Sequence, residues 1–188
     1  KAPWVNAGSM TNRGIDLGIN TYNITKPDFS WTSKVVFSHY KNKLVSLNQE
    51  NAELMRYTEF GNAVLLTRTV PGGPVGRFYG FVTDGLFGSV AEIQNSADQK
   101  LSVGPTGTWI GDVKYKDLNN DNVIDDKDMT YIGNPNPDFT YGISNSLRYK
   151  NFDFSLFLQG SYGGEILNYT RRTTESMRSP YFNQLKTV

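Results

Sequence analysis

The residues best suited to chemistry are the oxygen-bearing side chains that recur between Asp117 and Asp128. Counted from Asp117, they stand at positions 1, 3, 5, 9 and 12, and position 8 is apolar, which is the EF-hand calcium-loop arrangement. Calcium is a hard cation that takes 6–8 oxygen ligands, so carboxylates, amides and one backbone carbonyl suit it. The predicted ligands are Asp117, Asn119, Asp121, the Val123 carbonyl, Asp125 (directly or through water) and Asp128.

Two positions of this loop depart from the EF-hand pattern. Position 6 is Asn122 where the pattern has glycine, and asparagine is the next best residue for a left-handed turn. Position 12 is Asp128 instead of glutamate, and its shorter side chain changes the geometry of the closing ligand. Because the flanks lack helical character, we expect one EF-hand-like calcium loop, 117–128, that staples a larger connection. The competing interpretation is an acidic, solvated turn without a metal.

Residues for catalysis are scarce in the rest of the chain. It has one histidine, His39, and no cysteine, so a histidine base could come from that residue alone. The position of His39 at a strand end, beside Tyr40 and Lys41, favours a plain surface or lumen histidine. The glycine-rich segment 71–76 is a turn and not a phosphate-binding loop, because the GxxxxGK[ST] pattern is missing. The sequence therefore predicts no enzyme.

Composition narrows the function classes further. The net charge is +1, and 19 basic and 18 acidic residues are interspersed, so no basic stripe marks a nucleic-acid partner. No stretch approaches the ~18 apolar residues that a membrane helix requires. Aromatic residues make up 13%, with 11 tyrosines and 11 phenylalanines, and such a mixture favours strands. No signal-peptide pattern opens the sequence, so we expect an internal or mature segment of a protein.

Four segments alternate apolar and polar residues with a period of two, which is typical of β-strands. A slip of one residue would exchange the two faces, so each pattern also fixes its register. We predict an all-β fold with antiparallel strands. The apolar positions are Ile15, Leu17 and Ile19 in the first segment, Phe29, Trp31, Val35 and Phe37 in the second, Phe139, Tyr141, Ile143, Leu147 and Tyr149 in the third, and Phe152, Phe154, Leu156 and Leu158 in the fourth.

The connections between these strands differ greatly in length. A short turn at 24–28 joins the first two strands and a tighter one at 149–151 joins the last two. The connection from Asn48 to Asp138 far exceeds the ~12–15 residues at which a loop without structure of its own becomes uncommon. Inside it we expect local structure: a short helical turn at 49–57, strands at 63–70 and 78–87, and a turn at 71–74.

Two architectures suit strands of this kind. Short turns at one end and long loops at the other are typical of transmembrane β-barrels, whose tilted strands need about 9–11 residues to cross the hydrocarbon. Four strands cannot close a barrel, which needs about eight, so this reading predicts a transmembrane β-barrel fragment of a longer parent. The alternative is a secreted calcium-binding β-sandwich that acts as a glycan-binding or adhesion module. The long connection between two tight hairpins favours the barrel.

Several strings of the sequence resemble one protein family. The string GNPNPDFTYG, residues 133–142, follows the aspartate-rich stretch 111–128 and closely resembles a signature of the SusC/RagA-type TonB-dependent outer-membrane transporters. Segments 8–16, 78–87 and 159–164 also resemble pieces of that family, in the family's order. The resemblance spans nearly the whole chain and falls on late barrel strands.

This resemblance implies a function, a location and a set of partners. The family consists of barrels of about 22 strands with an internal plug, which import oligosaccharides or peptides with energy delivered by TonB. A SusD-type surface lipoprotein caps the barrel. The chain would then lie in the bacterial outer membrane, in contact with lipid, and serve nutrient uptake and glycan import.

The same resemblance assigns a role to each part of the chain. Residues 1–47 would form one barrel hairpin, and 48–138 would form a long extracellular loop that contains the calcium loop. Residues 139–188 would form a second hairpin and the start of the next loop. The plug, the segment that contacts TonB and the terminal strand are expected elsewhere in the parent.

Overall fold

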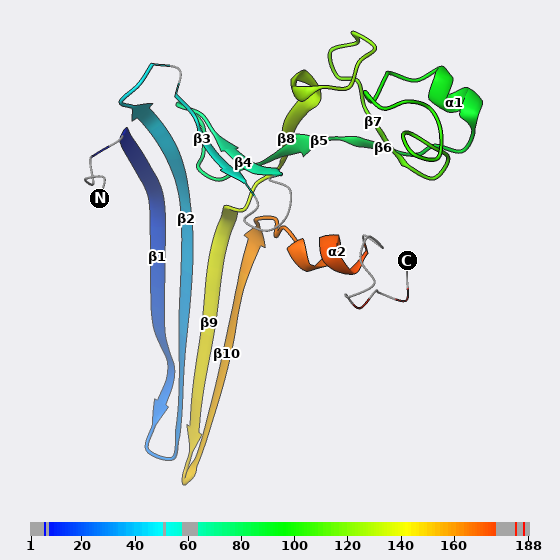
Figure 1. Cartoon of the computed structure of the whole chain (residues 1–188). Coiled ribbons are helices and arrows are strands. Elements are labelled where there is room, and N and C mark those ends of the chain that lie inside the picture. The colour runs from blue at the N-terminus through cyan, green and yellow to red at the C-terminus, as the bar shows by residue number, and fades with distance from the viewer. Residues whose placement is uncertain are drawn as a thin grey trace.

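The computed structural model describes residue 6, residues 8–50, 52–57 and 64–175, and residues 183 and 186. Its main element is a four-stranded antiparallel sheet in the order β1-β2-β9-β10, drawn as the long ribbons that run downward in Figure 1. β1 and β10 lie at its edges, so the described residues form antiparallel sheets and not a closed barrel. The strands are β1 (Gly8–Lys26), β2 (Phe29–Leu47), β9 (Pro137–Tyr149) and β10 (Phe152–Gly163).

Both hairpin turns of this sheet lie at the same end, the lower end in Figure 1. Pro27 and Asp28 turn the chain between β1 and β2, while Lys150 and Asn151 turn it between β9 and β10. The Lys150 N–H donates to the Asp28 carbonyl with an N···O distance of 2.8 Å, so the two turns are bonded to each other. The long connection between β2 and β9 therefore leaves and re-enters the sheet at the opposite end.

The strand register sorts the side chains of the long sheet onto two faces. Residues directly opposite each other on neighbouring antiparallel strands share a face, and the register pairs apolar with apolar residues. One such row crosses all four strands: Ile19, Val35, Ile143 and Leu158. We call this side the apolar face; its large members are Ile15, Leu17, Ile19, Ile24, Phe29, Trp31, Val35, Phe37, Phe139, Tyr141, Ile143, Leu147, Tyr149, Phe152, Phe154, Leu156, Leu158 and Tyr162.

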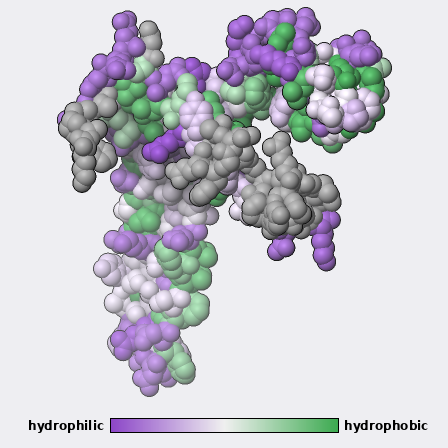
Figure 2. Space-filling view, in the orientation of Figure 1, coloured by the Kyte–Doolittle hydropathy of each residue, from purple (hydrophilic) through white to green (hydrophobic). Residues whose placement is uncertain are grey.

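The opposite side, which we call the polar face, carries mainly small polar and charged side chains. Its members include Asp16, Asn20, Ser30, Thr32, Lys34, Ser38, Thr140, Ser144, Ser146, Arg148, Asp153, Ser155, Gln159 and Ser161. The alternation predicted from the sequence is therefore confirmed in all four strands. In Figure 2, green apolar side chains lie along the sheet, and purple ones gather around the hairpin turns at its lower end.

A β-bulge in β1 keeps this pattern in register near the turn. The register shifts between Tyr22 and Ile24, so Asn23 is the extra residue and Ile24 lies opposite Trp31. Without the bulge Ile24 would lie on the polar face, because a shift of one residue exchanges the faces. The apolar face is also open: Ile15, Phe152 and Phe154 are 68%, 77% and 60% exposed.

The connection between β2 and β9 folds into a lobe of two small sheets (Figure 1). One sheet has the order β3-β4-β5-β8, with β3 (Leu54–Tyr57), β4 (Leu65–Thr69), β5 (Phe78–Phe81) and β8 (Met129–Gly133); the other pairs β6 (Thr83–Leu86) with β7 (Val113–Tyr115). Short helices are α1 (Val90–Gln94), the 3-10 helix η1 (Asp126–Asp128) and, after β10, α2 (Tyr169–Thr174). Among the described residues, no helix is long and apolar enough to cross a membrane.

Of the local elements predicted for this connection, one strand is confirmed, one helical turn is wrong and one strand is divided in two. The strand expected at 63–70 is confirmed as β4, apart from Ala63, which lies outside the described residues. The helical turn expected at 49–57 is wrong, because Leu54–Tyr57 forms β3 and pairs with β4, and this pairing overrides the local helix preference. The strand expected at 78–87 is two strands, because the chain leaves β8 for β7 as its partner near Val82.

The division of the chain into two barrel hairpins and an extracellular loop stays a prediction. Its last part, the start of the next loop, is described as far as Glu175; residues 176–188 lie outside the described chain apart from 183 and 186.

Candidate metal centre

The predicted calcium loop, 117–128, lies between β7 and β8 and ends in η1. Asn120 and Asn122 have φ angles of 61° and 64°, in the left-handed region that asparagine tolerates better than most residues. Asn122 therefore takes the conformation for which the EF-hand pattern uses glycine, as the sequence predicted. The loop is a tight turn flanked by strands and a 3-10 turn, not by two α-helices.

The side chains of the first half of the loop hold its backbone in place. The Asp117 carboxylate accepts hydrogen bonds from the backbone N–H groups of Asn120 at 2.7 Å and Asn122 at 2.8 Å. Asn119 Oδ1 accepts from the Asp121 N–H at 3.0 Å, and Asp121 Oδ1 accepts from the Val123 N–H at 3.0 Å. The side chains at positions 1, 3 and 5 therefore fix the backbone of this turn.

Asp128 closes the loop from its far end. Its side chain is fully buried, and its carboxylate accepts from the backbone N–H groups of Asp125 and Leu118, each at 2.8 Å. The bond from Asp125 is the largest cause that lowers the pKa of Asp128, and the bond from Leu118 lowers it further against the effect of burial. The Asn119 N–H lies 3.4 Å from the same carboxylate and also lowers this pKa, so the last acid of the loop lies beside its first residues. The loop thus holds a buried carboxylate in its charged form.

The apolar position of the loop anchors it to the lobe. Ile124 is buried, and its N–H donates to the Asp98 carbonyl at 2.8 Å, while the Asp98 N–H donates to the Asn122 carbonyl at 2.9 Å. These bonds form a bridge between Asp98 and Val123. Among the described residues of the lobe, Phe87 and Ile93 are also buried and apolar. Position 8 therefore attaches the loop to the segment that follows α1.

The acids of the loop are engaged with backbone N–H groups and lysines. Within the described residues, no three His, Cys, Asp or Glu side chains are grouped so that they could hold a metal ion. Lys100 lies 3.6 Å from Asp125, and Lys127 lies 3.7 Å from Asp121; both lysines are largely exposed, and exposed pairs of this kind contribute about 0–1 kcal/mol. The donors are nevertheless all oxygens, which is the set that calcium takes.

A second polar network, not foreseen from the sequence, joins the lobe to the long sheet. β2 and β9 pair only as far as Ser38 and Thr140, and beyond that point the turn 71–74 lies beside β2. Asn42 Nδ2 donates to Asn136 Oδ1 at 2.7 Å, and Asn136 Nδ2 donates to the Val75 carbonyl at 3.0 Å. These two asparagines are hydrogen-bonded across the gap where β2 and β9 separate. The residues are distant in sequence, so no local pattern could have revealed their pairing.

A network of hydrogen bonds around the ion pair of Glu53 and Arg68 links β4 to Met129, the residue that follows the loop. Arg68 donates to both carboxylate oxygens of Glu53, at 2.6 and 2.5 Å, and to the Tyr79 hydroxyl at 2.8 Å. The Tyr79 hydroxyl in turn donates to the carbonyl of Met129, the first residue after η1. The Arg68 guanidinium lowers the pKa of Glu53, chiefly through these hydrogen bonds. The small sheet is thus connected to the exit of the candidate metal loop.

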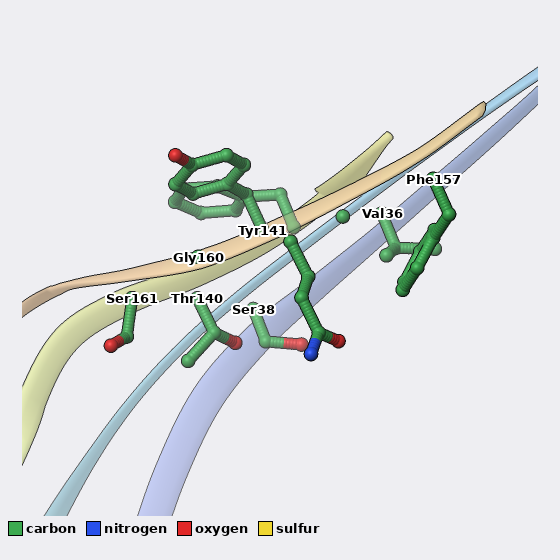
Figure 3. Close-up of a pocket in the computed structure, with 10 residues that line it drawn as sticks. Val36, Ser38, Thr140, Tyr141, Phe157, Gly160 and Ser161 are labelled. Carbon is green, nitrogen blue, oxygen red and sulfur yellow. The ribbon is translucent and has the colours of Figure 1, made fainter. Parts of the chain in front are cut away.

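A shallow hollow of about 440 Å³ lies across β2, β9 and β10. Figure 3 shows Tyr141 over Gly160 on one side of the strands, and Ser38, Thr140 and Ser161 on the other. A Cβ atom at Gly160 would lie 2.7 Å from the Tyr141 ring, so glycine is needed for this contact. The residues that line the hollow include no Asp, Glu, His, Lys or Arg.

Comparisons with known proteins give one consistent result. No protein-family model matches the chain. The TonB-dependent receptor P3 of Formosa agariphila is 37% identical over 167 residues, which cover 88% of this chain and 16% of P3. TonB-dependent receptor P26 of the same bacterium is 34% identical over 95% of this chain and 17% of P26, and P39 is 26% identical over 86% of this chain and 17% of P39. The chain therefore spans about a sixth of the length of these curated relatives.

Proposed function

We propose that this chain, which is homologous to a segment of TonB-dependent receptors, forms part of the wall of a transmembrane β-barrel in the bacterial outer membrane. The observation that carries the proposal is the division of the long sheet into an apolar and a polar face. Strands of outer-membrane barrels alternate in this way, with the apolar side toward lipid and the polar side toward the lumen.

The aromatic residues of the apolar face support this orientation. Phe29 and Tyr149 lie 6.4 Å apart between ring centroids near the hairpin turns. Phe139 lies 5.4 Å from Phe37 and 5.1 Å from Tyr162 towards the other end. At about 3.4 Å per residue, Phe29 and Phe37 are roughly 27 Å apart along β2, or about 20 Å across the membrane at a tilt of ~40°. Aromatic girdles flank an apolar band of about 25 Å in such barrels.

The two free edges of the sheet imply further strands from the same receptor. In lipid, an unpaired backbone group costs several kcal/mol, so β1 and β10 require partners. An open apolar face also counts against the alternative of a secreted β-sandwich, because no second sheet covers that face among the described residues. The short turns then lie at the periplasmic side and the lobe lies outside the cell.

Within these receptors we assign the chain to the SusC/RagA type, with oligosaccharides or peptides as imported substrates. The string at 133–142 supports this assignment, because it resembles a signature of that type. TonB would supply energy through other parts of the receptor, and a SusD-type lipoprotein would cap the barrel beside the lobe. Outer-membrane lipid would cover the apolar face.

We further propose that the loop 117–128 binds calcium and so stiffens the extracellular lobe. Asp117, Asn119, Asp121 and Asp128 would supply side-chain oxygens, Val123 its carbonyl, and Asp125 a direct or water-mediated ligand. In the described chain, no donor is bonded to the Val123 carbonyl. The Asp128 carboxylate is buried with its pKa lowered by backbone N–H groups, and a nearby cation stabilises such a charged group further. When bound, calcium would supply positive charge to the loop acids, which the exposed Lys100 and Lys127 neutralise only weakly.

Single cysteines placed along β9 test the orientation of the sheet. In a cysteine-free version of the full-length receptor, a lipid-phase maleimide should label positions 143 and 147 in outer membranes. A water-soluble reagent should prefer positions 144 and 146 on the polar face. Labelling that does not alternate, or water-soluble labelling that favours positions 143 and 147, would contradict the proposed barrel wall.

A further inference from the structure

We propose that the extracellular end of the apolar face binds the anionic, phosphate-bearing headgroup of an outer-leaflet lipid. The binding residues would be Arg13, Lys41 and Lys43, which we call the basic cluster. This inference rests on the proposed function, because it needs the apolar face to be in contact with lipid.

The register of β1 and β2 places the basic cluster on the apolar face. Arg13 lies directly opposite Lys41, and this pair follows the pair of Ile15 and His39 on the same face. Lys43 is two residues further along β2 and shares that face. All three cations are exposed. The His39 Nδ1–H donates to the Asp138 carbonyl, so this side chain is already engaged in the sheet.

The charges of the long sheet are distributed unequally between its faces. Its strands contain three carboxylates, and Asp16, Asp138 and Asp153 all lie on the polar face. The apolar face has no acid in β1, β2, β9 or β10. Apart from the basic cluster and His39, its one charged residue is Lys26, which lies at the other end, opposite Phe29.

The basic cluster has no acidic partner in the part of the chain that the structure describes. Within the described residues, Arg13, Lys41 and Lys43 form no ion pair, whereas the lysines of the lobe pair with Asp84, Glu92, Asp121 or Asp125. Three like charges on neighbouring strands repel one another. A bound anion would remove that repulsion.

The position of the cluster selects the source of the anion. Lys41 lies about 14 Å beyond Phe37 along β2, at about 3.4 Å per residue, so it follows directly after the upper aromatic residues. Long basic side chains at this depth extend to the headgroup layer. A substrate in the lumen would meet the polar face and not this one. The chemistry therefore suits a lipid phosphate held beside the barrel, with three cations that can share one anionic group.

The test uses the full-length receptor in outer membranes and in detergent. The variant R13Q/K41Q/K43Q removes the cluster, and the control K34Q/R148Q removes two cations from the polar face. After purification, lipopolysaccharide with intact phosphates and its enzymatically dephosphorylated form serve as probes, and native mass spectrometry measures how much of each stays bound. Inorganic phosphate is added in a separate arm as a competitor.

Each cation near an anionic surface contributes roughly fivefold in binding, so the triple variant should retain phosphorylated lipid at least about tenfold less well than the unaltered receptor. The control should retain it fully, and the dephosphorylated form should not distinguish the proteins. Equal retention by the triple variant and the unaltered receptor overturns the inference, and so does displacement by inorganic phosphate alone, which would indicate a simple anion site. Membrane fractionation is done before the lipid-binding measurement. If the receptor is missing from the outer membrane, the proposed function itself is contradicted. If the receptor is in the membrane but the triple variant retains lipid equally well, only the lipid-binding inference is contradicted.

Discussion

Replacement of Ile143 by arginine should strongly destabilise the full-length receptor in the outer membrane. Ile143 lies on a central strand in a row with Val35 and Leu158, midway along the apolar face. A cation at the bilayer midplane on the lipid side of a barrel strand costs about 2–4 kcal/mol. That cost is a large part of the 5–15 kcal/mol by which most proteins are stable. Urea-induced unfolding in vesicles would measure the loss.

The matched control is Ser146→Arg on the same strand. Ser146 is exposed on the polar face, where it lies opposite Thr32 and Ser155. We expect this variant to keep its unfolding free energy within about 0.5 kcal/mol, as substitutions at exposed sites usually do. If both arginine variants lose the same stability, or if only Ser146→Arg does, the apolar face is not the side that meets lipid.

Removal of calcium should loosen the lobe and increase its cleavage between about Leu101 and Gly133. A ligand present at a hundred times its dissociation constant stabilises the folded state by about 2.7 kcal/mol, and that contribution vanishes with a chelator. Asp121→Ala should make the receptor as sensitive to protease in calcium as the unaltered receptor is in chelator. Limited proteolysis with mass spectrometry of the fragments would locate the cuts.

Asp126 provides the control for this experiment. It lies in the same acidic stretch, is exposed and is not among the predicted ligands. Asp126→Ala should therefore leave both the calcium response and the cleavage pattern unchanged. Identical digestion with and without chelator would identify the loop as a solvated acidic turn held by its own backbone hydrogen bonds.

The strands of the long sheet were predictable because their signal is local. The alternation from Phe139 to Tyr149 repeats every second residue, and the observed register keeps those residues on one face. The bulge at Asn23 was not predicted, although the sequence carries its trace: apolar residues stand at odd positions from Ile15 to Ile19 and at an even position at Ile24. The helical turn expected at 49–57 failed for a different reason: β3 forms because β4 pairs with it, and that partner is not encoded in the segment itself.

For the candidate site, too, local features were predictable and contacts between separate segments were not. Residue types and spacing at 117–128 predicted the left-handed turn at Asn122. The role of Asp128 as a calcium ligand stays a prediction. The burial of Asp128, the bonds from Arg68 to Glu53 and the basic cluster depend on contacts between distant segments. Arg13 and Lys41 are separated by a whole hairpin, so only the register shows that they share a face.

The location and size of the native protein test most directly whether this sheet spans the outer membrane. We predict that an antibody against residues of the lobe detects a product several times longer than this chain, which pellets with outer membranes and changes its electrophoretic mobility on heating, as folded barrels do. Recovery of a product of about this length from the soluble secreted fraction would contradict the account.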